Sequence, residues 1–147
     1  MNWYKEAQAS IVFEIKEIQE ITSKEKMSLH KLNLGKYDKL YDSFKTYVKD
    51  PEAFDYSMAK VVLAKNTIDK IVGWALINPP NQDNQSDVFI YVAKRERRQG
   101  VGRKLVEISK QYLTQNKQRP NYIIHDKVSK DFYESIPGLS WNTEYNY

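Results

Sequence analysis

The sequence has no cysteine, so its 147 residues form no disulfide, no thiolate metal site and no cysteine nucleophile. It also lacks an apolar run of about 18 residues, the length that crosses a bilayer. No apolar stretch follows a basic start at the N-terminus, and we expect a cytoplasmic protein without a secretory signal. With only two histidines, His30 and His125, a metal site would depend on carboxylates, and we predict no metal.

Composition and length are those of a globular chain. Hydrophobic residues make up 41% of the sequence and charged residues 29%. A chain of 147 residues has the length of one ordinary domain, and no repeat or Gly/Ser-rich linker divides it. We therefore interpret residues 1–147 as a single domain.

The positive charge is concentrated in one segment. The formal net charge is +4, and the stretch from Lys94 to Lys104 alone holds six basic residues and one acid. Such a concentration favours a compact anion site over a basic face that follows a nucleic-acid backbone. A nucleic-acid-binding module remains the alternative, although nucleic acid is not the partner we expect. A salt titration separates the two, because phosphate-backbone binding falls steeply with salt.

Hydrophobic periodicity predicts the elements of secondary structure. Alternating or continuous apolar runs between turn residues predict strands over residues 59–64, 71–77, 88–92 and 122–124, with a polar loop over 79–86. Helical spacing predicts helices over residues 35–49, 102–115 and 128–136. The first 18 residues fit both patterns, and we favour a short helix followed by a strand. Residues 139–147 have room for one last strand.

The order of these elements predicts the topology. The strand, loop, helix and strand of residues 88–124 predict a parallel crossover, whereas the two strands before them predict an antiparallel hairpin. We therefore expect an α/β fold, with a mixed sheet and helices on both faces.

Two glycines mark the segment in which chemistry is most expected. Gly100 and Gly102 lie where a buried strand enters a loop that opens a helix. Backbone N–H groups and the helix dipole attract anions at such a helix N-terminus, and a diphosphate is the natural ligand. The dinucleotide fingerprint is incomplete, because Leu105 stands in place of its third glycine. Full positive charges come from Arg97, Arg98 and Arg103.

The run Arg97-Arg98-Gln99-Gly100-Val101-Gly102 resembles the signature R/Q-x-x-G-x-G/A of the GNAT superfamily of N-acetyltransferases, which follows the fourth strand of that family. Val92 and Leu105 fit the longer form of the pattern. Further along, Asp126, Ser129 and Tyr133 fall at the spacing of the family's N-x-x-A-x-x-x-Y motif, although the aspartate and serine depart from it. The two matches cover residues 88–139.

This resemblance implies an N-acetyltransferase that moves an acetyl group from acetyl-coenzyme A to a primary amine by direct attack. The acceptor would be a small molecule or a protein amine. The resemblance places the pantetheine arm beside the strand backbone and the diphosphate on the glycine loop. The implied cofactor-binding residues are Ile90, Tyr91, Val92, Arg97, Arg98, Gln99, Gly100, Val101, Gly102, Arg103 and Asp126.

The resemblance also implies catalytic roles. Tyr133 would protonate the departing thiolate, which suits a phenol with an ordinary pKa near 10, and the alternative is an aromatic side chain that only packs. The family's acid on the fourth strand is replaced by Phe89, so Asp87 and His125 are the candidates for the general base. The departures from the family pattern favour one rival, a catalytically silent coenzyme A-binding interaction domain.

The C-terminal part is shorter than the resemblance implies. Family members close the sheet with two strands after the tyrosine-bearing helix, whereas residues 139–147 fit only one. We therefore expect a GNAT-like sheet that is shortened at its C-terminal end and has an exposed edge. The prediction is that residues 3–18 or a second copy of the chain, in a homodimer, cover this edge.

Overall fold

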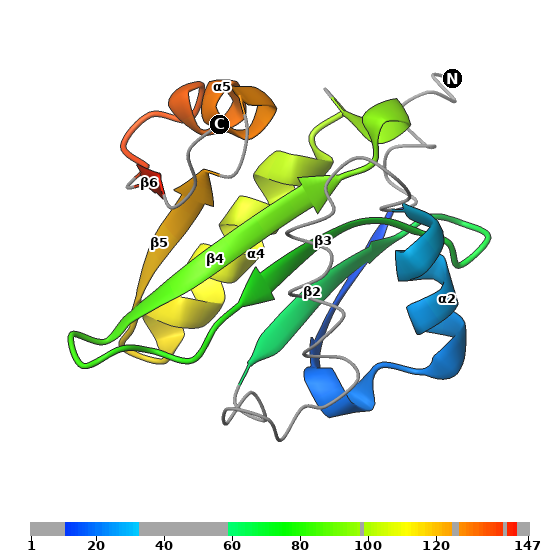
Figure 1. The fold of residues 1–147 in the computed structure, drawn as a ribbon, viewed down its shortest axis with the longest axis horizontal. Coiled ribbons are helices and arrows are strands. Elements are labelled where there is room, and N and C mark those ends of the chain that lie inside the picture. The colour runs from blue at the N-terminus through cyan, green and yellow to red at the C-terminus, as the bar shows by residue number, and fades with distance from the viewer. Residues whose placement is uncertain (1–10, 33–58, 98, 125–126, 140, 144–147) are drawn as a thin grey trace.

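A computed structural model describes residues 11–32, 59–97, 99–124, 127–139 and 141–143. Its centre is a six-stranded sheet in the order β1-β2-β3-β4-β5-β6 (Figure 1). The first four strands pair antiparallel, β5 is parallel to β4, and β6 is parallel to β5. This confirms the predicted mixed sheet. The strands are β1 (Val12–Glu17), β2 (Lys60–Lys65), β3 (Ile71–Ile77), β4 (Gln85–Val92), β5 (Arg119–Ile124) and β6 (Trp141–Thr143).

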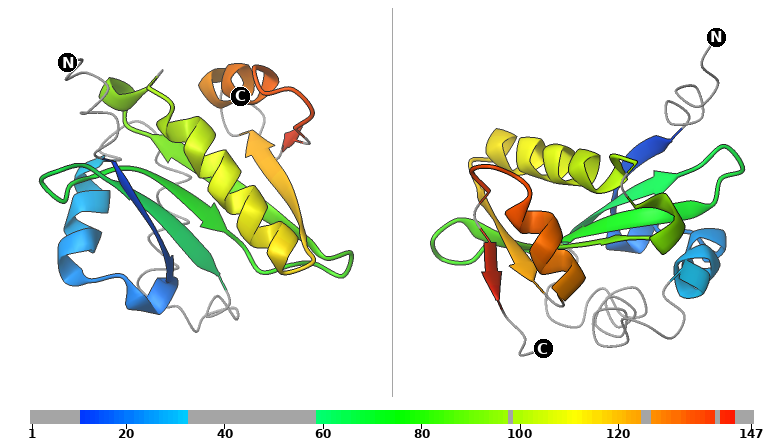
Figure 2. Two further views of the ribbon diagram at one scale, coloured as in Figure 1. Left: turned by 180° about the vertical axis from the view of Figure 1, so that it is seen from behind. Right: turned by 90° about the horizontal axis from the view of Figure 1, so that it is seen from above.

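Helices cover both faces of the sheet, as predicted (Figure 2). On one face, α2 (Ser23–Leu32) packs against a buried cluster that includes Trp74 and Phe89. On the other face, α4 (Val101–Gln115) and α5 (Lys127–Glu134) pack against a second cluster that includes Val88 and Tyr122. The core is therefore two apolar layers separated by the sheet. Two short 3-10 helices, η1 (Ile18–Glu20) and η3 (Lys94–Glu96), complete the described elements.

Strands β4 and β5 begin three residues earlier than their apolar runs predict. The polar residues 85–87 of β4 pair with residues 119–121 of β5, so the predicted loop over 79–86 is too long. Pro120 is tolerated inside β5 because its nitrogen faces away from β4. The neighbouring Arg119 N–H turns toward the β4 side and donates to the Asn84 carbonyl at 2.8 Å. On the β6 side, the register among the described residues begins only at Tyr122, so no ladder bond is lost at Pro120.

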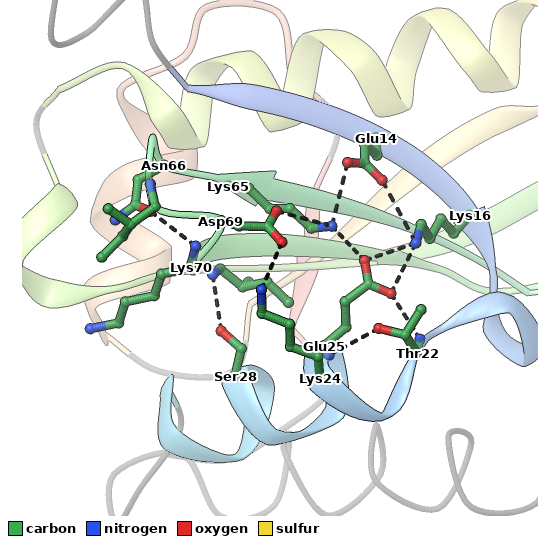
Figure 3. A network of polar contacts seen from close by, with 12 residues as sticks. Glu14, Lys16, Thr22, Lys24, Glu25, Ser28, Lys65, Asn66, Asp69 and Lys70 are labelled. Carbon is green, nitrogen blue, oxygen red and sulfur yellow. Dashed lines mark hydrogen bonds and ion pairs between the residues drawn. The ribbon is translucent and has the colours of Figure 1, made fainter.

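Helix α2 was not predicted, because its sequence is mostly polar. Its first turn is fixed by Thr22 and Glu25: the Thr22 hydroxyl accepts the Glu25 N–H, and the Glu25 carboxylate accepts the Thr22 N–H. Figure 3 shows that Glu25 also bonds Lys16 of β1 and Lys65 of β2. Glu25 and Lys65 are both buried, so this ion network joins α2 to the sheet.

One prediction about the sheet edges is wrong in part. The N-terminal strand β1 pairs with β2 and lies at the edge opposite β6, so residues 11–18 do not cover the C-terminal edge. β6 provides the single strand expected after α5. The homodimer remains a prediction. The helix expected over 35–49 and the one expected before β1 fall outside the described residues, and no described helix is long and apolar enough to cross a membrane.

Candidate active site

Strands β4 and β5 separate halfway along their length. Their parallel register runs from Gln85 opposite Arg119 to Val88 opposite Tyr122, and among the described residues it ends there. β4 continues to Val92 and β5 to Ile124. Figure 1 shows the two strands diverging toward their carboxyl ends. Beyond Val88, the edge of β4 that faces β5 therefore has no backbone pairing with β5 among the described residues. We call the place where the two strands diverge the opening.

The hydrogen bonds of β4 show which backbone groups face this opening. Alternate residues of a strand turn their N–H and C=O groups to opposite neighbours. The Ala93 N–H donates to the Val72 carbonyl at 2.8 Å, so Tyr91 also turns its backbone toward β3. The backbone groups of Ile90 and Val92 turn toward the opening. Of the three strand residues predicted to bind pantetheine, Ile90 and Val92 turn their backbone groups toward the opening and Tyr91 does not. Their binding of pantetheine stays a prediction.

Gly100 begins α4 in a conformation that only glycine adopts readily. Its φ is +87°, and a Cβ atom built on it meets nothing within 4 Å. The next N–H groups, those of Val101, Gly102 and Arg103, belong to the first turn of α4, which has no preceding turn to bond. Open space over a helix N-terminus fits an anion such as a diphosphate.

At position 102, close packing against a neighbouring helix favours glycine. A Cβ atom at this position would lie 2.9 Å from Cζ and 3.1 Å from Cε1 of Phe132 on α5. The second glycine of the motif therefore lets α5 pack against the first turn of α4. Val101 is buried, so its contribution to a ligand site is limited to its backbone.

Arg97 is held at the end of β4. Its Nε donates to the Val92 carbonyl at 3.0 Å, and its guanidinium carbon lies 5.8 Å from the centroid of the Tyr91 ring. The Tyr91 hydroxyl in turn donates to the Leu32 carbonyl of α2 at 3.4 Å. Arg97 thus joins the glycine loop to the strand. Of the other predicted side chains of the loop, Arg103 is exposed and Gln99 is half-buried like Arg97, while Arg98 lies outside the described residues.

Tyr133 lies at the point where β4 and β5 separate. Its side chain is fully buried, with its ring centroid 5.6 Å from that of Tyr122 and 5.2 Å from that of Phe132. The Tyr122 side chain is hydrogen-bonded to α4: its hydroxyl bonds the Ser109 hydroxyl at 2.9 Å and the Val106 carbonyl at 3.1 Å. Burial raises the pKa of Tyr122 to about 12, against the opposing effect of the Ser109 hydrogen bond.

Asp87 lies at the same point of the sheet but on the opposite face. It is half-buried, and its Oδ1 accepts the Asn121 Nδ2 at 2.9 Å. Phe89 and Tyr91 share its face, and both pack in the α2-side cluster. The other two predicted residues of the site, His125 and Asp126, lie outside the described residues. Asn121, the partner of Asp87, was not predicted from the sequence. It is identified only by the β4–β5 register.

A comparison with models of protein families identifies one family. The model of a family described as an acetyltransferase (GNAT) domain matches residues 58–136, more than half of the chain. No curated protein matches the sequence.

Solved structures resemble the fold at low sequence identity. A GNAT-family acetyltransferase from Desulfovibrio desulfuricans has a TM-score of 0.68 at 17% identity, over 85% of this chain and 82% of that one. An aminoglycoside acetyltransferase from an uncultured soil metagenomic sample, in complex with sisomicin, has a TM-score of 0.66 at 18% identity over 95% of both chains. A ribosomal-protein-alanine N-acetyltransferase from Brucella melitensis has a TM-score of 0.62 at 14% identity, over 93% of this chain and 96% of that one.

Proposed function

Because this chain belongs to the GNAT acetyltransferase family, we propose that it transfers an acetyl group from acetyl-coenzyme A to a primary amine. Family membership makes the chain an acyltransferase. The donor and the acceptor are the proposed parts. Two of the structural neighbours are named for amine acceptors, an aminoglycoside and the alanine of a ribosomal protein, and this supports an amine as the acceptor class.

The separation of β4 from β5 is the observation that carries the proposal. Ile90 turns its N–H and carbonyl into the opening and Val92 its N–H, while the Val92 carbonyl already accepts from Arg97 Nε. The amide-rich pantetheine arm of coenzyme A can pair with these strand groups as a further strand would. The opening leads to Gly100 at the start of α4, where open space and helix N–H groups suit the diphosphate. Acetyl-coenzyme A bound there would supply the activated acetyl thioester.

The site offers an acid for the leaving group. Tyr133 packs beside Tyr122, the β5 residue of the last paired position, and we assign it the proton that the departing thiolate takes up. Tyr122 does not suit this role, because its hydroxyl is engaged with Ser109 and Val106 and its pKa is raised to about 12. Direct attack by the amine needs no enzyme nucleophile, in keeping with a chain that has no cysteine.

The amine must also lose a proton. Asp87 and His125 remain the two candidates for accepting it, directly or through water. Asp87 lies on the α2 face of the sheet and Tyr133 on the α4 face, so the acceptor and the leaving thiolate would lie on opposite faces of the opening. We propose that the acceptor approaches from the α2 face.

Mass spectrometry tests the proposed function. The protein is incubated with acetyl-coenzyme A and four kinds of amine: a diamine, an aminoglycoside, a peptide with a lysine and a peptide with a free N-terminal alanine. We expect one acetylated product and an equal amount of free thiol. Thiol release without an acetylated amine would mean that water is the acceptor, and would contradict transfer to amines. The variant Gly100→Glu is the negative control.

A further inference from the structure

Three polar side chains form a row across the sheet at the amino end of β4. Asn78, directly after β3, lies opposite Asp87 and donates its N–H to the Asp87 carbonyl at 2.9 Å. Asp87 lies opposite Asn121 of β5 in the register. Residues opposite each other on neighbouring strands project their side chains from the same face, so the row lies on the face that carries Phe89.

One hydrogen-bond acceptor of the row has no donor among the described residues. Asn121 Nδ2 donates to Asp87 Oδ1, which holds the carboxylate in place as an acceptor. Asn78 Oδ1 is buried and, within the described part of the chain, accepts no hydrogen bond. An unpaired buried oxygen costs on the order of 1–3 kcal/mol, and in native proteins it calls for a partner such as a water molecule or a ligand. The Asn78 oxygen therefore has room for a donor from outside the row.

The missing donor is best supplied by a cation. Asp87 carries a negative charge in a half-buried position, and no lysine or arginine among the described residues forms an ion pair with it. An ammonium group has three donors and no acceptor, which complements a carboxylate oxygen and an amide oxygen on adjacent strands. A neutral hydroxyl would satisfy the amide oxygen but would leave the carboxylate charge uncompensated.

The row lies next to the proposed active site without forming part of the opening. Asp87 is one position before Val88, where the β4–β5 ladder ends. Ile90, the first β4 residue beyond that point whose backbone turns into the opening, is three residues further along, or roughly 10 Å at the rise of a β-strand. The basic loop follows the other end of β4, so the charges at the two ends of this strand are opposite in sign.

We propose that Asn78, Asp87 and Asn121 bind an ammonium group of the acceptor other than the amine that is acetylated. The acceptor is then a diamine or polyamine, with one charge held by the row and the reacting amine presented to the opening. This inference rests on the proposed function and narrows its acceptor class. It makes Asp87 a binding group for the acceptor, and not the general base.

The test uses cadaverine, a diamine, and pentylamine, its monoamine counterpart. Each is titrated into the coenzyme A complex of the ¹⁵N-labelled protein, and the side-chain amide signals of Asn78 and Asn121 are followed by NMR. We expect cadaverine to shift both signals and to bind at least tenfold more tightly than pentylamine. Asp87→Asn should remove this difference, because it removes the charge but keeps an oxygen for Asn121. Asp83→Asn, which removes an exposed charge four residues away, should retain the difference.

A second variant separates a ligand from a structural water. Asn78→Ala should weaken cadaverine binding about tenfold, whereas an unchanged dissociation constant would mean that a water satisfies this oxygen and would overturn the inference. Equal binding of the two amines, or an unaffected Asp87→Asn variant, would also overturn it. With acetylated cadaverine as product, Asp87→Asn should raise KM and leave kcat nearly unchanged, whereas loss of a base would lower kcat. Cadaverine-specific shifts without any acetyl transfer would support the row and contradict the proposed function.

Discussion

Val88 of β4 and Tyr122 of β5 form the last paired position between the two strands, and both faces of the site can be located from this pair. On the α4 face, the Tyr122 ring packs 5.6 Å from the ring of Tyr133. On the α2 face, the preceding pair brings Asp87 to Asn121. The proposed acid and the proposed acceptor subsite therefore lie at the same level of the sheet, on opposite sides of it.

The role of Tyr133 is tested by Tyr133→Phe. The substitution removes one oxygen and keeps the ring that packs against Tyr122 and Phe132. We expect the affinity for coenzyme A to be unchanged and turnover to fall by about 10²-fold, the usual scale for the loss of a general acid. Tyr112→Phe is the matched control, because it also removes one tyrosine hydroxyl, at a half-buried position of α4. Unchanged turnover in Tyr133→Phe would make this tyrosine a packing residue.

The contact between Gly102 and Phe132 predicts a coupled pair of substitutions. Gly102→Ala would place a methyl group 2.9 Å from Phe132 Cζ, so the Phe132 ring or α5 itself must shift. We expect a loss of about 1–3 kcal/mol in the free energy of unfolding, and a lower turnover because Tyr133 follows Phe132 on α5.

A double-mutant cycle with Phe132→Leu checks this coupling by urea denaturation. The smaller side chain makes room for the added methyl group, so the double variant should be more stable than the sum of the two single effects predicts. Additive effects would contradict a direct contact between these positions.

Because the pKa of Glu25 is lowered in the folded protein, we expect the protein to lose stability in acid. Burial opposes its ionisation, but hydrogen bonds from Lys16 and Lys65 outweigh burial and lower the pKa of Glu25 from 4.5 to about 2. Because the pKa is lower in the folded state, the stabilisation is complete above about pH 4.5 and is lost as the pH falls toward 2. Its size is on the order of 3 kcal/mol.

The pH dependence of unfolding measures this contribution. Glu25→Gln should be less stable at neutral pH and should lose less stability between pH 4.5 and 2 than the unmodified chain. Glu107→Gln, at an exposed position of α4, is the control and should leave the pH dependence nearly unchanged. Parallel curves for Glu25→Gln and the unmodified chain would show that the network of Figure 3 does not hold this carboxylate ionised.

The sequence predicts most of the sheet, because its central strands have clear apolar patterns. The strand predicted over residues 71–77 has the same bounds in the structure, and the helix after the glycine loop starts one residue earlier than predicted. Helix α2 has too few apolar residues for its periodicity to be visible, but the spacing Thr22-Ser23-Lys24-Glu25 is that of a capping box and could have identified its start.

The site is harder to predict than the fold. The glycine motif locates the start of α4, but the sequence does not show that Gly102 makes room for Phe132, 30 positions further along. Likewise, Asn121 meets Asp87 only through the β4–β5 register, which brings together residues that are 34 positions apart. Such pairings depend on how the strands align, and a single sequence does not encode this in a local pattern.

Calorimetry with coenzyme A on two glycine variants tests the central claim most directly. Gly100 and Gly138 both have positive φ, +87° and +73°, and a Cβ atom at either position meets nothing within 4 Å. A glutamate therefore brings the same charge and a similar backbone strain to both positions, but only Gly100 lies at the start of α4. We predict micromolar or tighter binding by the unmodified chain and by Gly138→Glu, and no measurable binding by Gly100→Glu. Binding by Gly100→Glu as tight as that of the unmodified chain would contradict the account.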